Sequence, residues 1–487
     1  MRTRISFRSG AGLNLELGLA LLGLISSLSC WAVAESNNPD VLATAPVIKA
    51  GPANEINAAG QVPSADANKV FTIVDAVKYT LENNPILKQY REAINQAEQT
   101  HDLDRASLLP SISYTLKGGS ATTATLSGNT VLFGGNVYNT YNGDLNLTQP
   151  LFVYGSLAAL RSANDAIALN RVNVELQERT LTTQVISSFY NIVLYKKLLM
   201  FLEEQKPVVE KSVLTTQERY RIGRSQLLDV LQAQTQLALL QPQIETSRGQ
   251  FAASGAQLAS VLGMSNVSQI SVKGRLRTIL MKDVKPILSD SKQVYFPELE
   301  QNQIQRNQVR ENKNVEMGKY WPTAYFYANY NQNAYSQTDF FTPAASYWNA
   351  YIGVTIPIFQ GFASKYDSAV YLSQEIQLEH TLHQLDNTIS TNQVTNKTAV
   401  ESAEASLISA VEADNLAQAS LKEAIRQYKL ATIDFLQFLT IEQSALTSKS
   451  SVEQLRYNSL VAYTNYFVSL GQPLKNWIEV LNSGVSP

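Results

Sequence analysis

The chain passes twice from an alternating, strand-like run through proline, one apolar residue and phenylalanine to a glycine that opens a long helical tract. The two passages are LTQPLFVYGSLA at 147–158 and VTIPIFQGFASK at 354–365. Proline cannot donate to a sheet ladder, so each proline is predicted to end or edge a strand. The next glycine is predicted to let the backbone turn into the helix. The predicted strand–helix junction residues are Pro110, Pro150, Gly155, Pro322, Pro357 and Gly361.

Further landmarks recur in the same order in both halves. The interval from Pro85 to Pro110 is repeated between Pro297 and Pro322. ERYRIGRSQLLDVLQAQ at 218–234 aligns with RQYKLATIDFLQFLTIEQ, which starts at Arg426. Landmarks at nearly constant offset indicate one structural unit used twice. Each unit is predicted to run helix, strand, loop, strand, long helix, turn, helix.

The predicted boundaries follow from this duplication. A signal peptide is predicted at 1–34, a flexible segment at 35–69 and a C-terminal tail at 479–487. The first repeat covers 70–285, with a strand pair at 111–150 and a helical hairpin at 155–263. The second repeat covers 290–478, with a strand pair at 323–357 and a helical hairpin at 361–470.

The predicted strands have two different faces. Ile112, Tyr114 and Leu116 alternate with polar residues, and the run 347–356 also alternates between two faces. Strict alternation over about 10 residues is enough for a tilted strand to cross a bilayer. The alternative is an edge strand of an ordinary soluble sandwich.

The predicted helices carry apolar residues every seven positions, as coiled coils do. About 65 helical residues would extend roughly 100 Å. The repeating positions are Leu160, Ile167, Val174 and Leu181; Val230, Leu237, Ile244, Phe251 and Leu258; and Leu439, Leu446, Leu460 and Phe467, with Glu453 interrupting the last series.

The N-terminus is typical of an exported protein. Three arginines precede an apolar stretch, and Ala32-Val33-Ala34 fits a cleavage site before Glu35. The alternative is an amphipathic helix that stays attached. Ser27 stands where a lipoprotein usually has leucine before its cysteine, so lipidation of Cys30, the only cysteine, is not expected. After this leader no apolar run of about 18 residues predicts a membrane helix, so insertion would require a β-barrel.

Four strands cannot close a barrel, because about eight are the working minimum. Open sheet edges in lipid are unfavourable, so the chain is expected to oligomerise. The predicted fold is α plus transmembrane β: a trimeric, twelve-stranded β-barrel with four strands per chain, which continues into a long α-helical barrel and contains an internal two-fold repeat.

This pattern resembles the TolC-like outer-membrane efflux protein family. The resemblance covers about 70–475 and depends on NPIL, LLPSISYT, QPLFVYG and RYRIGRSQLLDVLQAQ with their second-repeat partners. It implies a homotrimeric channel-tunnel in the Gram-negative outer membrane, with its helical barrel in the periplasm. The implied partners are a periplasmic adaptor (membrane fusion) protein, an inner-membrane pump of RND or ABC type, and outer-membrane lipid.

The resemblance also places a periplasmic gate at the helical turns, 220–229 and 428–437. In the family, polar links between helices hold this mouth shut, and Tyr428 and Asp229 match two such positions. Ile433 stands where an arginine is expected, and Gln437 and Thr440 replace two aspartates that ring the constriction. The mouth is therefore predicted to be closed by Tyr428 and Asp229 links but to bind cations more weakly. Asp229 could instead be a solvated turn residue. The gate candidates are Tyr220, Asp229, Tyr428, Gln437 and Thr440, the last two replacing aspartates, and the adaptor-docking candidates are Ile222, Gly223, Arg224, Ala431, Thr432 and Ile433.

No catalytic or cofactor motif stands out. The net charge of −2 gives no basic excess for nucleic acid, and only 16% of residues are charged. His380 and His383 share a helical face, but Glu379 precedes them in the wrong order for a zinc motif. The chain is therefore predicted to be no enzyme, with no metal and no cofactor. Two other functions stay open: a structural coiled-coil spacer of the cell envelope and, more remotely, a secreted helical enzyme.

Overall fold

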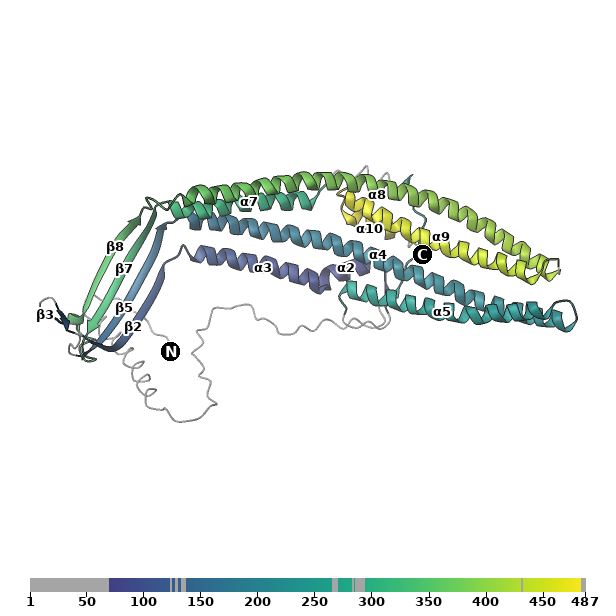
Figure 1. Ribbon diagram of the computed structural model, residues 1–487, viewed down its shortest axis with the longest axis horizontal. Helices are drawn as coiled ribbons and strands as arrows, with labels where there is room; N and C mark the ends of the chain where they lie inside the picture. Colours follow the sequence, from purple (N-terminus) through teal and green to yellow (C-terminus); the bar gives the residue numbers. More distant parts are fainter. Residues whose placement is uncertain are drawn as a thin grey trace, which may run out of the picture. The chain divides into compact units, whose positions relative to one another are not determined.

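The computed structural model describes residues 70–122, 125–127, 130–132, 137–264, 270–282, 284, 294–430 and 432–482. The predicted signal peptide and flexible segment lie outside these residues. The elements are β1 (Val70–Phe71), α2 (Ile73–Asn83), α3 (Pro85–Ala106), β2 (Ser111–Thr122), β3 (Thr125–Ser127), β4 (Thr130–Leu132), β5 (Val137–Phe152), α4 (Tyr154–Arg221), α5 (Leu227–Leu262), β6 (Ser271–Val272), α7 (Pro297–Met317), η1 (Gly318–Tyr320), β7 (Thr323–Ala334), η2 (Pro343–Ala345), β8 (Ser346–Thr355), α8 (Ala363–Lys429), α9 (Phe435–Ser469) and α10 (Leu474–Asn482) (Figure 1).

The described residues form two compact units. One holds 101–161 and 311–369 and contains the main sheet. The other holds 70–100, 162–310 and 370–482 and is largely helical. The predicted combination of long helices with antiparallel strands is confirmed.

The main sheet has four antiparallel strands in the order β2-β5-β7-β8 (Figure 1). Residues paired across antiparallel strands project from the same face. The register places Ile112, Leu147, Ala328 and Ala350 in one row. The next row along the same face holds Tyr114, Leu145, Tyr330 and Trp348. We call this side the apolar face.

The opposite side is the polar face. One of its rows holds Ser113, Asn146, Asn329 and Asn349, and the Asn329 amide donates to the side-chain oxygen of Asn146. The two charged side chains of these four strands, Lys117 and Asp144, both belong to the polar face by register. The sheet therefore separates an uncharged surface from a hydrogen-bonding one.

Pro150 departs from its prediction as a strand end. It lies inside β5, which continues to Phe152. The last β2 partner in this strand is Thr148, and the register with β7 shifts between Pro150 and Phe152. Proline is tolerated here because the strand has lost its β2 neighbour and forms a bulge. Pro357, in contrast, follows the end of β8.

The two junction glycines have different roles, which corrects the predicted equivalence. Gly361 has φ +61°, in the left-handed region, and Phe362 follows at φ +59°. Gly155 has no positive φ and is the second residue of α4. It lies against Gly318, where an added Cβ would come within 2.5 Å of the Gly155 backbone. Gly155 thus permits close packing, not a turn. Pro110 and Pro322 directly precede β2 and β7.

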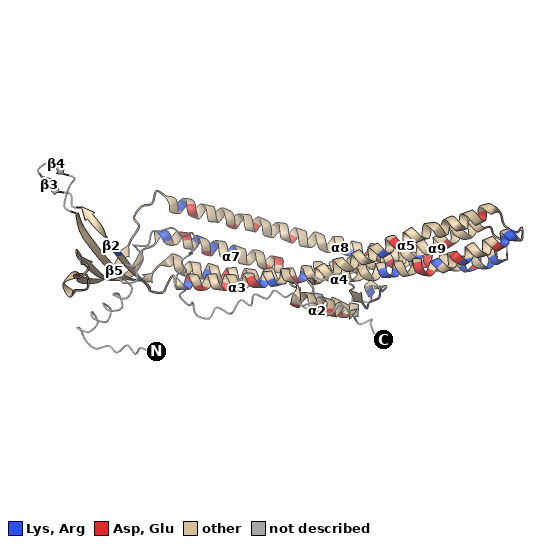
Figure 2. Ribbon diagram, turned by 90° about the horizontal axis from the view of Figure 1, so that it is seen from below, with Lys and Arg blue, Asp and Glu red and all other residues tan. Residues whose placement is uncertain are grey.

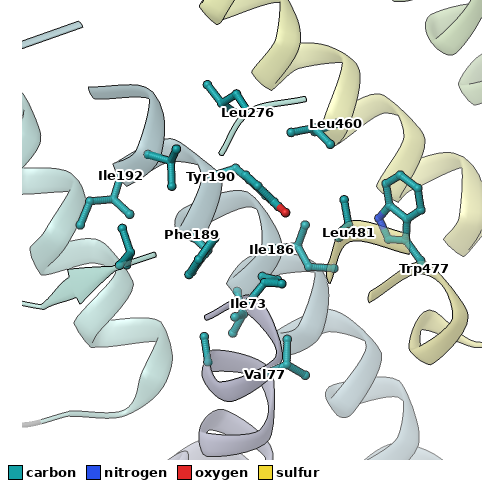
Figure 3. Packing of buried hydrophobic residues seen from close by; sticks show 14 of the residues in the cluster. Ile73, Val77, Ile186, Phe189, Tyr190, Ile192, Leu276, Leu460, Trp477 and Leu481 are labelled. Carbon is teal, nitrogen blue, oxygen red and sulfur yellow. The ribbon is translucent and has the colours of Figure 1, made fainter. Parts of the chain in front are cut away.

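The largest apolar core lies in the helical unit. It brings together α2, α4, α5, the 272–284 segment, α9 and α10 (Figure 3). Trp477 is fully buried, stacks on Phe467 with 4.7 Å between ring centroids, and donates its indole N–H to Thr464 over 2.8 Å. Leu481 is also buried, so residues 479–482, predicted as a tail, continue α10 into the core.

Helix α4 contains Pro207 and runs unbroken for 68 residues. It is the one helix among the described residues that is long and apolar enough to cross a membrane, by length and composition alone. The sequence had predicted no membrane helix after the leader. A core helix passes the same test, and half of the apolar window in α4 is buried by the protein itself.

Candidate functional site

The candidate site is the pair of turns that join α4 to α5 and α8 to α9, all within the helical unit. The first turn uses Gly223 at φ +73°, a conformation that glycine adopts without strain. The second helix of each hairpin begins with a side-chain cap. Asp434 accepts the backbone N–H of Gln437 over 2.7 Å at the start of α9. Charged residues of both signs mark these turns (Figure 2).

Tyr428 is the buried centre of the site and joins the two hairpins. Its hydroxyl lies 2.8 Å from the hydroxyl of Thr216 on α4. Thr216 also donates its only hydroxyl hydrogen to the carbonyl of Ser212 over 2.8 Å. The phenol of Tyr428 must therefore be the donor to Thr216.

Arg219 makes a second link to Tyr428. Its guanidinium carbon lies 4.2 Å from the centre of the Tyr428 ring, a cation–π arrangement. The same guanidinium donates to the backbone carbonyls of Tyr428 and Lys429. These are among the last carbonyls of α8, which lack partners within their own helix. Arg219 of the first hairpin thus caps the first helix of the second.

An aromatic cluster supports these polar links. The ring of Tyr428 stacks on Phe438 at 4.9 Å, and Phe435 lies 6.0 Å away. Val213 of α4 and Ala233 of α5 belong to the same buried cluster. Apolar side chains from all four helices therefore pack beside the turns.

Asp229 has local partners in this chain. Its carboxylate accepts the Ser225 hydroxyl over 2.6 Å and the Gln226 backbone N–H over 3.0 Å, which caps the start of α5. The hydrogen bonds of the described residues include none between Asp229 and Tyr428. Tyr220, which aligns with Tyr428 in the sequence, is 47% exposed.

The remaining predicted residues surround the turns. Gln437 and Thr440 are exposed on α9, and the Thr440 hydroxyl donates to the carbonyl of Leu436. Ile433 packs against the aromatic cluster. Thr432 donates to the carbonyl of Gln427 over 3.0 Å. Ile222 and Arg224 are exposed at the first turn, whereas Ala431 lies outside the described residues.

Sequence reasoning missed Thr216 and Arg219. The alignment of the repeats drew attention to the matching tyrosines, but the residue that contacts Tyr428 is the arginine before Tyr220. The available signal was a basic residue in the last turn of α4, where the hairpin ends. Such a residue is positioned to interact with helix C-terminal carbonyls.

Two carboxyl groups near the site are electrostatically unusual. Hydrogen bonding to Arg426, one turn away, lowers the pKa of Glu423 to about 2. Burial raises the pKa of Glu442 on α9 to about 7. Glu442 is only 6% exposed, so its carboxyl group stays mostly protonated up to about pH 7.

A buried ion cluster lies further along α9. Glu453, which interrupts the predicted apolar repeat, accepts Lys197 of α4 over 2.8 Å and Arg456 over 2.7 Å through one carboxylate oxygen. Its side chain is 6% exposed. This cluster joins α4 to α9 by charge at a position where a coiled-coil seam is normally apolar.

No group of three or more His, Cys, Asp or Glu side chains is arranged for metal binding within the described residues. His380 and His383 are exposed on α8.

Known proteins resemble the chain in sequence and in structure. A model of the outer membrane efflux protein family matches residues 76–264. The alkaline protease secretion protein AprF of Pseudomonas aeruginosa is 27% identical over 189 residues, which cover 37% of this chain and only 38% of AprF. The probable outer membrane lipoprotein SilC of Salmonella typhimurium is 22% identical over 355 residues, 70% of this chain and 73% of SilC.

Structural similarity extends over most of the chain. The outer membrane channel CmeC of Campylobacter jejuni superimposes with a TM-score of 0.72 at 14% identity, covering 85% of this chain and 90% of CmeC. At this identity the match establishes a shared fold. The match to the outer membrane efflux protein family lies in residues 76–264, and the structural match extends the fold of these channels over most of the chain.

Proposed function

We propose that the chain is one subunit of a homotrimeric outer-membrane channel-tunnel, a passive exit duct from the periplasm to the outside. The four strands of each copy would contribute to one twelve-stranded barrel. The helical hairpins of three copies would form a helical barrel in the periplasm. This is the TolC-like architecture that the family match of residues 76–264 and the shared fold support.

One observation carries the proposal: the sheet has two different faces and two edge strands that pair with no further strand among the described residues. β2 and β8 are the edges. An open edge in lipid leaves backbone groups without partners, so the sheet needs copies of itself to close. A coiled-coil spacer would not need such a sheet.

We also propose that the chain arose by duplication. The order α3, β2, β5, α4, α5 is repeated as α7, β7, β8, α8, α9, which supports this reading. The proposed repeats keep the boundaries 70–285 and 290–478. The differing roles of Gly155 and Gly361 would then be later divergence between the two copies.

The two turns are proposed to form the periplasmic mouth. The Tyr428 links to Thr216 and Arg219 would hold the hairpins together in the closed state. Asp229 would act by ordering the first turn, and the exposed, uncharged Gln437 and Thr440 would leave the mouth with weak cation affinity. The exposed turn residues Ile222, Gly223 and Arg224 would meet the adaptor. A pump of RND or ABC type would supply the energy.

The cargo would be chosen by the pump, because the duct supplies no binding chemistry of its own. AprF is named for protease secretion. A duct of the same architecture would serve protein or small-molecule export equally.

The test is single-particle electron microscopy of the detergent-extracted protein together with conductance in planar bilayers. Three-fold particles that form discrete channels are the expected result. Compact monomers without conductance would overturn the proposal and would return the spacer function to first place.

A further inference from the structure

We propose that the apolar face holds one acyl chain of an outer-membrane lipid in a groove floored by Ala328 and Ala350. The inference rests on the proposed function only in that the sheet must meet lipid. It assigns a binding site and a ligand class to particular side chains.

The groove is a shallow hollow of about 300 Å³ on the four-stranded sheet. Ala328 and Ala350 are directly paired between β7 and β8. Larger pairs flank them on the same face: Tyr330 with Trp348 on one side, and Phe326 with Ile352 on the other. Because the two alanine side chains are shorter than the pairs on either side, they form the floor of a groove about one side chain wide. The full lining is Ile112, Leu145, Leu147, Ala328, Asn329, Tyr330, Trp348, Asn349 and Ala350.

A loop residue packs near one end of this face. Phe340 is 2% exposed, although it belongs to the segment between β7 and β8. A Cβ on Gly143 would come within 2.8 Å of the Phe340 ring and 2.6 Å of the Tyr114 hydroxyl. Gly143 therefore leaves room for two aromatic rings to pack beside the lining residue Leu145.

The chemistry of the lining selects an uncharged chain. Lys117 and Asp144, the charged residues of the four strands, belong to the polar face. The side chains of Asn329 and Asn349 also alternate to that face. Ile112 and Trp348 are 68% and 75% exposed, so no described part of this chain covers the groove. Exposed apolar surface of this kind is favourable only against another apolar group.

A second copy of the chain is the competing occupant, and the sheet argues against it. Copies would add to the free edges of β2 and β8 through backbone pairing, which leaves the face uncovered. Cargo in a duct would meet the polar face. Membrane lipid is the apolar partner that remains, with Tyr330 and Trp348 placed as aromatic residues often are near a membrane interface.

The experiment compares the full-length protein with Ala328→Leu, Ala350→Leu and the matched control Ala324→Leu. Ala324 lies on the same face of the same strand but outside the groove. Each protein is extracted from the outer membrane in mild detergent and examined by native mass spectrometry for bound phospholipid. We expect one lipid per chain in the wild type and the control. Occupancy should fall roughly tenfold in the two filled-groove variants, because several buried CH₂ contacts are lost.

Equal occupancy in all four proteins, or bound detergent in place of lipid, would overturn the acyl-chain site. The same preparations are tested for conductance in planar bilayers. Proteins that conduct but show no difference in lipid binding contradict this inference alone. A wild type that neither inserts nor conducts contradicts the proposed function itself.

Discussion

The side chain of Tyr428 makes three different kinds of interaction. Its hydroxyl donates to Thr216, its ring face receives Arg219, and its other contacts are aromatic. These interactions differ in how they respond to substitution. Loss of the hydroxyl removes one hydrogen bond but leaves the ring in place. Loss of the acceptor leaves a buried phenol without a partner, which is more unfavourable.

Tyr428→Phe should therefore weaken the association of the two helical hairpins by about 1 kcal/mol, and Thr216→Val should weaken it by about 2 kcal/mol. Both variants should raise the open fraction of the channel in planar-bilayer recordings. Tyr220→Phe is the control, since that side chain is 47% exposed. Equal recordings for all three variants would contradict a role for Tyr428 in closure.

Glu442 predicts a pH dependence with a definite sign. Burial raises its pKa from 4.5 to about 7, so the folded protein holds a proton that the unfolded chain releases. Its contribution to stability is full below about pH 4.5 and is lost as the pH rises to about 7. Glu442→Gln should remove this loss, which is worth at most about 3 kcal/mol. The melting temperature of the variant relative to the wild type should be higher at pH 8 than at pH 5. The same difference at both pH values would contradict the prediction.

At the scale of elements, the seam between α4 and α9 is interrupted by charge. Glu453 could be predicted as an interruption of the heptad pattern, but its partners could not. Lys197 lies far away in the sequence, and only the antiparallel packing of the two helices brings it within 2.8 Å. Periodicity identifies a buried stripe, whereas a pairing between helices also needs their register.

Removing one member of this cluster should destabilise the helical unit. Glu453→Ala leaves Lys197 facing the seam and should lower the free energy of unfolding by roughly 2 to 4 kcal/mol, discounted because Lys197 is 30% exposed. The pair Glu453→Leu with Lys197→Met should recover most of that loss, since it restores an apolar seam. Thermal melts with Lys211→Met, an exposed lysine of α4, as control would check this. A double variant no better than Glu453→Ala would contradict it.

The strands were predictable because alternation is a local property of the sequence. The structure places strands on the alternating runs and aligns their apolar positions on one face. Local rules failed at Pro150 and Gly155. A proline is tolerated in a strand only where the neighbouring strand that would need its N–H has ended. A junction glycine can serve either to reverse the backbone or to allow close helix packing, and for Gly155 a distant contact with Gly318 decides which.

Gly318→Ala tests the close packing directly. Its new Cβ would lie 2.5 Å from backbone atoms of Gly155, and backbone cannot rotate away as a flexible side chain can. The expected loss is roughly 2 to 4 kcal/mol, seen as a lower melting temperature and less assembled protein in the outer membrane. Gly119→Ala is the control because no atom lies within 4 Å of its added Cβ. Similar losses in both variants would argue against a specific role for the glycine pair.

At the scale of the whole molecule, cross-linking can detect closure between copies. The only cysteine is Cys30 in the predicted signal peptide, so no native cysteine of the mature chain would compete with introduced cysteines for disulfide formation. In one chain, β2 and β8 are separated by β5 and β7, about 14 Å of sheet, which is too far for a disulfide.

Cysteine at Thr115 on β2, combined in turn with cysteine at Tyr347, Asn349 or Tyr351 on β8, should form disulfides only between copies. Non-reducing gels should show dimers and trimers with no larger species. A ladder that continues past three copies, or no cross-link at any tested pair, would contradict a closed three-copy barrel.

The unpaired edges of the sheet also have a genetic consequence. In the proposed trimer, a subunit that cannot complete a barrel alone depends on its neighbours, so one defective copy would impair the whole channel. With equal amounts of normal and defective chains, only about one in eight randomly mixed trimers would be wholly normal. Defects that preserve assembly should therefore be dominant over the normal allele, whereas defects that prevent folding should be recessive.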